Sequence, residues 1–152
     1  LQKRIYIPDK NRKDVYHMIV DIRNFLPSDA PEKKRRFSKR HKYEAEIEEL
    51  IRALGVTGDY TGFRYLVMAI ETVIDNKETI QAITKEVYPD IAKYYGTTMK
   101  AVERSIRTIR DVIWQHANRA ALDAIMGCHV TEKPKNSKLI DGIANYISKN
   151  HQ

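Results

Sequence analysis

The sequence has 152 residues, a formal net charge of +7 and a single cysteine, Cys128. It contains no apolar run near the roughly 20 residues that cross a bilayer, and its first residues lack the apolar core of a signal peptide. No internal disulfide can form, which suits a reducing compartment. These properties exclude a membrane-spanning or disulfide-stapled chain and predict a cytoplasmic protein of one domain with an appendage.

The positive charge is concentrated at the N-terminal end. Residues 1–43 contain 13 Lys/Arg against 5 Asp/Glu, a balance of +8, whereas residues 44–152 contain 14 against 15, a balance of −1. Apolar residues at helical spacing predict a helix over residues 11–26, and the basic, proline-containing stretch that follows is typical of a linker. We therefore divide the chain into a basic N-terminal extension, residues 1–43, and a helical domain, residues 44–152.

Apolar residues recur at intervals of three and four along the second part, which is the period of amphipathic helices. Besides the stretch around residues 89–114, these stripes predict helices over residues 47–54, 63–74, 80–87, 121–126 and 137–149. Gly55 and Gly127 follow two of the stripes and are typical helix ends, and Asn76 is a plausible helix cap. No alternating strand pattern of useful length occurs. The sequence thus predicts an all-α fold, a compact bundle of about six helices.

The stretch PDIAKYYGTTMKAVERSIRTIRDVIW, residues 89–114, has the pattern of a helix-turn-helix. A short first helix is expected over Asp90–Tyr95, with Pro89 at its favoured first-turn position. Gly96 supplies the tight turn, because a residue without Cβ adopts positive φ at little cost. Thr97 or Thr98 is then placed to cap the second helix.

The second helix has one apolar and one basic side. Val102, Ile106, Ile109 and Ile113 form the apolar stripe. At about 100° per residue, Lys100, Arg104 and Arg107 fall opposite, flanked by Glu103 and Arg110. Long cationic side chains on such a helix can reach guanine edges and phosphates in the major groove. Because many charged helix faces simply contact water, it is the order of helix, small residue, glycine and aliphatic that favours DNA binding here.

Residues that could support other chemistry do not form a convincing site. His116, Cys128 and His129 match no common zinc spacing and lack a fourth ligand. The sequence contains no glycine-rich phosphate loop and no nucleophile elbow. We therefore predict no catalytic residue, no metal and no cofactor.

Several segments resemble one known family. EVYPDIAKYYGTTMKAVERSIRTIRDVIW, LIRALGV, GFRYLVMAI and KPKNSKLIDGIANYI are similar to the DNA-binding effector domain of the sporulation-initiation response regulators, the stage zero sporulation protein A family. The resemblance covers about residues 44–150, and YPDIAKYY and VERSIR are its most specific parts. Residues 1–43 have no counterpart in it, and VTGDYTG is a less typical turn.

The resemblance implies a transcription regulator that binds promoter DNA and contacts RNA polymerase sigma subunits. The base-reading residues would be Glu103, Arg104 and Arg107, with DNA-backbone contacts from Thr97, Thr98, Lys100 and Arg110. Members also carry a phosphorylated receiver domain, for which residues 1–43 are too short. The chain is therefore expected to be either an effector fragment or a receiver-less relative, and no phosphorylation site is assigned. Pairs of domains on tandem DNA sites are expected as well, with the helix Ser137–Lys149 and its Tyr146 as a candidate homodimer contact.

Two alternatives stay open at this stage. A helix-turn-helix scaffold can serve as a protein-interaction module that binds polymerase or a related regulator without reading DNA, although Arg104 and Arg107 argue against that reading. The basic extension can also favour RNA binding.

Overall fold

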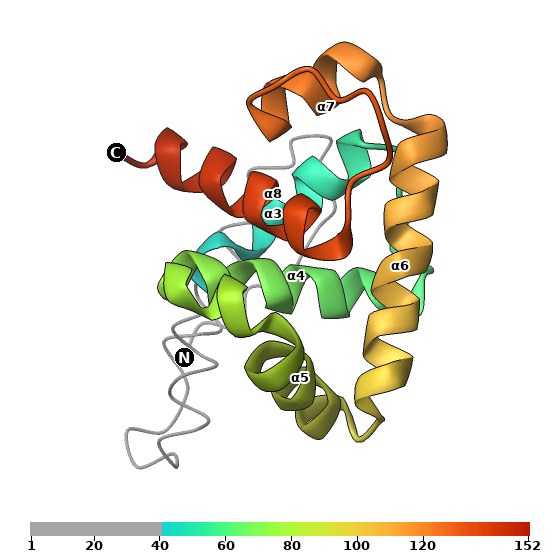
Figure 1. Ribbon diagram of the computed structural model, residues 1–152, viewed down its shortest axis with the longest axis vertical. Coiled ribbons are helices and arrows are strands. Elements are labelled where there is room, and N and C mark those ends of the chain that lie inside the picture. Colours follow the sequence, from blue (N-terminus) through green and yellow to red (C-terminus); the bar gives the residue numbers. More distant parts are fainter. Residues whose placement is uncertain (1–40) are drawn as a thin grey trace, which may run out of the picture.

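The computed structural model describes residues 41–152 (Figure 1). These residues form the α-helices α3 (Glu44–Ala53), α4 (Thr61–Asp75), α5 (Tyr88–Tyr95), α6 (Met99–His116), α7 (Arg119–Met126) and α8 (Asn136–Asn150). Three short helical turns accompany them: η1 (His41–Tyr43), η2 (Lys77–Ala82) and η3 (Ile83–Val87). The all-α fold of about six helices is thereby confirmed, and the described part of the chain contains no strand. None of its helices combines the length and apolar character needed to cross a membrane.

The expected helix over residues 11–26 and most of the expected linker lie outside the described residues. Of the extension that we assigned to residues 1–43, the described part is the turn η1. Its Tyr43 packs against the hydrophobic core and makes an edge contact with the His151 ring at the other end of the domain, with 5.0 Å between centroids.

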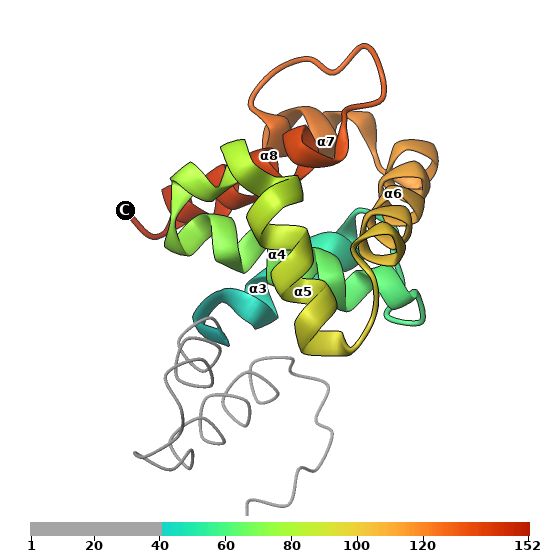
Figure 2. The ribbon, with the colours of Figure 1, turned by 60° about the horizontal axis from the view of Figure 1, so that its bottom comes forward.

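Helix α4 lies at the centre of the bundle. Figure 1 shows it running across the molecule, with α6 upright beside one end, α8 along it and α5 on the opposite side from α8. The second view shows α5 crossing in front of α4 (Figure 2). Almost every α4 residue from Gly62 to Val73 is buried, because neighbours cover the helix on all sides. A helix that is apolar nearly all round is the sequence pattern expected of such a central element.

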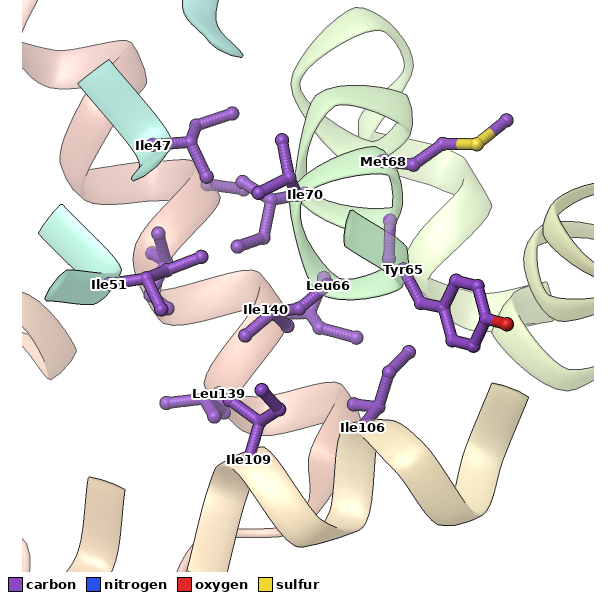
Figure 3. Close-up of a cluster of buried hydrophobic side chains, with 14 of the residues drawn as sticks. Ile47, Ile51, Tyr65, Leu66, Met68, Ile70, Ile106, Ile109, Leu139 and Ile140 are labelled. Atoms are coloured by element: carbon purple, nitrogen blue, oxygen red, sulfur yellow. The ribbon is translucent and has the colours of Figure 1, made fainter. Parts of the chain in front are cut away.

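The core forms where α4, α6 and α8 meet. Figure 3 shows aliphatic side chains from the three helices converging on one another, with Ile47 and Ile51 of α3 closing the cluster. Leu66, Ile70, Ile106, Ile109, Leu139 and Ile140 are fully buried. Burying each such side chain contributes about 1.5–3 kcal/mol to folding before conformational entropy is counted. Two of these residues belong to α6, so the helix that we expected to bind DNA is anchored by the core itself.

The segment before the helix-turn-helix differs from the sequence-based expectation. One ordinary helix was expected over residues 80–87, but the chain forms a 3-10 turn, η2, followed by a π-helical turn, η3. The Tyr88 N–H bonds to the Ile83 carbonyl, and α5 begins at Tyr88 rather than Asp90. Proline has no N–H and can occupy a first helical turn, so Pro89 allows the helical path to continue into α5.

Smaller differences concern side-chain environment. Ala121, expected on the apolar side of α7, is exposed, while Leu122 and Ile125 are buried as predicted. Helix α7 is only two turns long, so its buried stripe is narrow.

Asn76 caps as predicted, since its side chain accepts a hydrogen bond from the Glu78 N–H over 3.1 Å. Tyr146 of α8 is half-buried and packs against the core, which leaves less of it for a contact with another chain.

Gly62 determines how closely α4 approaches α6. A Cβ atom at this position would lie 2.3 Å from the Ser105 carbonyl oxygen and 2.6 Å from its carbon. Its third neighbour would be a side-chain carbon of Ile109 at 3.0 Å. The nearest atoms belong to helix backbone, which cannot move aside independently of α6. The α4–α6 crossing therefore requires a residue without a side chain.

We predict that Gly62→Ala lowers the free energy of unfolding by about 1–3 kcal/mol, because the new methyl group must push the helices apart. Gly142→Ala is the matched control, since its Cβ would meet the end of the flexible Met126 side chain, 2.6 Å from the sulfur. That side chain can rotate away, so the loss should be smaller. Urea denaturation followed by circular dichroism measures both values. Equal stability of the Gly62 variant and the parent would contradict the close-packing account.

Candidate nucleic-acid interface

Helix α5, a three-residue turn and helix α6 form the helix-turn-helix. Gly96 ends α5 in the left-handed conformation, with φ 66° and ψ 38°. No atom lies within 4 Å of a Cβ built there, so the backbone conformation, not the available space, favours glycine. The N–H of Thr97 donates to the Ala92 carbonyl over 2.8 Å and so satisfies the end of α5. The turn that we predicted from Gly96 is therefore present.

The two threonines after the glycine have different roles. Thr98 is the cap of α6, because its hydroxyl accepts a hydrogen bond from the Ala101 N–H over 3.1 Å. Thr97 is half-buried, and its hydroxyl forms no hydrogen bond with the described residues. The sequence had left the choice between them open, and the structure selects Thr98. Both lie at the start of α6, where unpaired N–H groups favour an anion.

Helix α6 separates its two faces as predicted. Val102, Ile106, Ile109 and Ile113 are all buried. Lys100, Arg104 and Arg107 are exposed on the outward face, which belongs to the N-terminal half of the helix. The structure thus brings together three cations on a rigid element whose rear is fixed in the core.

Glu103 and Arg107 are joined by an ion pair. The Arg107 Nη2 lies 2.8 Å from the Glu103 Oε1, one helical turn away, and the side chains are 53% and 37% exposed. An exposed pair of this spacing contributes about 0.3–0.5 kcal/mol, so it can open at small cost. Both side chains remain accessible from solution.

A buried phenol supports this part of α6 from below. Tyr88, at the start of α5, is almost fully buried. Burial raises the pKa of its phenol above the usual value, while the neighbouring Asn136 side chain acts in the opposite direction. Asn136 also donates from Nδ2 to the Glu103 carbonyl over 3.4 Å. The first residues of α5 and α8 therefore meet beneath the Glu103 turn of α6.

Arg110 lies at the edge of the outward face and not fully on it. Its side chain is only 16% exposed, and its Nη2 lies 3.2 Å from the Asp111 Oδ1. Lys133, from the loop between α7 and α8, approaches the same oxygen to 3.0 Å. Lys133, and to a smaller extent Arg110, hold the pKa of the Asp111 carboxyl below its usual range. The contacts of Lys133 and Asn136 with α6 carry no signal in the sequence, because no local pattern links a loop to an element more than 20 residues away.

The three residues weighed as metal ligands do not gather. Among residues 41–152, no group of three or more His, Cys, Asp or Glu side chains is arranged to hold a metal ion. His129 lies 2.8 Å from an Asp123 oxygen, whereas Cys128 is exposed in the same loop. Asp123 also accepts the Val130 N–H over 2.9 Å, so this aspartate orders the loop after α7.

A helix-turn-helix with a buried rear stripe and an exposed basic front defines a DNA-binding domain of the kind that transcription regulators use. The sequence profile of one family, described as the sporulation initiation factor Spo0A C terminal, matches residues 47–147. The chain belongs to this family of DNA-binding regulatory domains, and the resemblance found from the sequence is confirmed. The match runs from within α3 through most of α8 and includes the whole helix-turn-helix, α5 to α6.

The α6 cap gives a direct test of the turn. Thr98→Ala should lower the free energy of unfolding by about 1 kcal/mol, because the Ala101 N–H loses its side-chain acceptor. Thr97→Ala, a neighbouring change of the same type, should cost clearly less because no hydrogen bond is removed. Denaturant titration of the two variants checks the difference. If both lost the same stability, Thr98 would not be acting as the cap.

Proposed function

We propose that this domain recognises a specific promoter DNA sequence by placing the N-terminal half of α6 in the major groove. The observation that carries the proposal is the exposure of Lys100, Arg104 and Arg107 on one face of a helix whose other face is fully buried. A rigid helix of this kind presents its donors with little loss of conformational entropy on binding. Membership of the family supports the general role as a DNA-binding transcription regulator.

In this proposal, Glu103, Arg104 and Arg107 read base edges. An arginine matches the two acceptors of guanine, and a glutamate can accept from the cytosine amino group. A good bidentate contact provides about 1–3 kcal/mol of discrimination, which exceeds the value of the exposed Glu103–Arg107 pair. Both side chains can therefore exchange their mutual contact for contacts with bases.

The backbone contacts come from the ends of the same element. Thr97 and Thr98 sit at the positive end of α6, and Lys100 lies within the first turn of the helix, on its exposed face. Arg110 has the least access, but Asp111 engages only its Nε and one Nη, which leaves other N–H groups of the guanidinium for a phosphate. These contacts would set position and register, whereas the base contacts would set sequence.

The proposal also includes a role for the N-terminal extension and one protein partner. Residues 1–43 would form a separate basic extension that adds non-specific attraction to phosphates, since they carry an excess of eight positive charges. A contact with an RNA polymerase sigma subunit would convert DNA binding into regulation. The chief alternative, a protein-interaction module that does not read DNA, is tested by the same experiments.

Arg104→Ala and Arg107→Ala should each weaken binding to the preferred duplex by about 1–3 kcal/mol and relax base choice at the contacted positions. The preferred duplex is first obtained by selecting bound sequences from a random DNA pool. Fluorescence anisotropy at one salt concentration then compares each variant on the selected and a random duplex. Arg52→Ala, an exposed arginine on α3, is the control for loss of one charge. Unchanged preference in both α6 variants, with folding intact, would rule out base reading by these arginines.

One α6 helix contacts only a few base pairs, so we expect two domains to bind tandem sites together. The free protein should sediment as a monomer at micromolar concentration, and two molecules should bind cooperatively when the sites are about ten base pairs apart. Inserting about five base pairs places the second site on the opposite side of the duplex and should abolish cooperativity. Gel-shift titrations of both duplexes make the comparison. Equal cooperativity at both spacings would leave independently bound monomers as the better description.

A further inference from the structure

A segment far from α6 in sequence runs beside it in the fold. Asn136 at the start of α8 contacts the Glu103 carbonyl, and Lys133 contacts Asp111, eight residues further along α6. At about 1.5 Å per residue, these two contacts are separated by roughly 12 Å of helix. The end of the α7–α8 loop therefore follows the recognition helix over two turns, and Figure 1 shows this loop descending beside α6 before α8 begins.

This segment is held in place at several points. Asp123 binds the loop near its beginning through the Val130 N–H and His129. Pro134 has a fixed φ between the two lysines, and α8 begins directly after Lys135. Lys133 and Lys135 are thus carried by an ordered part of the chain, so bringing them to a ligand costs less conformational entropy than ordering a free arm.

The charges on this flank favour an anion. The row of cations on the outward face of α6 stops at Asp111, which falls on the same side of the helix as Arg104. Both Arg110 and Lys133 neutralise that carboxylate. Lys133 keeps a 42% exposed side chain, and Lys135 is exposed without an ion pair to any described residue. Glu132 is the acidic residue of the segment itself, so this flank carries three cations, Lys133, Lys135 and Arg110, against two carboxylates, Asp111 and Glu132.

We propose that Lys133 and Lys135 form a second phosphate-contacting element, which binds the DNA backbone at the edge of the groove that α6 enters. This inference rests on the proposed function, because it assumes that α6 lies in the major groove. Phosphates line both edges of that groove, about 12 Å apart, so an element packed along the flank of the helix meets one of them. An ammonium group has three N–H donors, and Asp111 occupies only one of those on Lys133. The Lys133–Asp111 and Asn136–Glu103 contacts fix the spacing between this element and the base-reading residues.

The test compares two double variants of the full chain that remove the same charge. Lys133→Ala with Lys135→Ala changes the proposed element, whereas Lys85→Ala with Lys149→Ala removes two exposed lysines from η3 and from the other end of α8. Anisotropy titrations on the selected and the random duplex are repeated at several KCl concentrations. Each lost phosphate contact lowers the slope of log K against log salt concentration by about 0.9. The first double variant should therefore lose nearly two in slope and on the order of tenfold in affinity near physiological salt, equally on both duplexes.

Three results would overturn the proposal: an unchanged slope, an equal fall in the control pair, or a loss confined to the selected duplex. Lys135→Ala alone keeps the Lys133–Asp111 contact and should lower the slope by about one, so the test survives any folding defect of the double variant. Arg104→Ala is measured in parallel to separate the two proposals. A parent that prefers no sequence, but whose slope falls in the lysine variants, would refute base reading and support the second element. A parent that binds no duplex would refute both.

Discussion

The contact of α4 with α6 at Gly62 is the constraint on which the arrangement of the candidate DNA-binding face depends. Backbone meets backbone there, since a Cβ would lie 2.3 Å from the Ser105 carbonyl oxygen. Such a contact fixes the distance between two helices more firmly than interlocking side chains, which can change rotamer. On the opposite flank, Asn136 of α8 reaches the Glu103 carbonyl. Helix α6 is thus held on one side by α4 and on the other by the first residue of α8, which directly follows the segment proposed to bind phosphates.

The balance of charge explains why placement matters more than total charge in this domain. Residues 44–152 have a formal balance of −1, so no overall positive field exists to attract a nucleic acid. Six of the 14 Lys and Arg residues in this part of the chain instead lie on or beside α6: Lys100, Arg104, Arg107, Arg110, Lys133 and Lys135. The two acidic residues of α6 among them are compensated, Glu103 by Arg107 and Asp111 by Arg110 and Lys133. In the proposed function, the basic extension would therefore provide the long-range attraction to DNA, and the helical domain would recognise the sequence.

Sequence periodicity predicted the parts of the fold that depend on local pattern. The buried stripe of α6 and the turn at Gly96 were predicted from spacing and residue type, and both are confirmed. Gly62 carried no such signal, because its role arises from the crossing with Ser105, more than 40 residues away. The π-helical turn before Pro89 could not be predicted from the sequence either, because it has the same apolar spacing as an ordinary helix. The contacts of Lys133 and Asn136 with α6 required tertiary structure, so the candidate interface was predicted only where it is local.

The free energies of the proposed base and phosphate contacts indicate what each kind of contact contributes to specificity. Three base-reading residues at about 1–3 kcal/mol each give a single domain roughly 3–9 kcal/mol of discrimination at most, less what is lost to imperfect geometry. Specific binding proteins commonly need about 4–10 kcal/mol over non-specific DNA, because a genome offers millions of competing sites. At the middle of the two ranges, about 6 against about 7 kcal/mol, one domain falls slightly short. Phosphate contacts raise affinity for every sequence equally, so they add no discrimination between sequences. A second domain that reads a neighbouring site would roughly double the discrimination, which is the advantage that pairing on DNA gives to the short reading surface of α6.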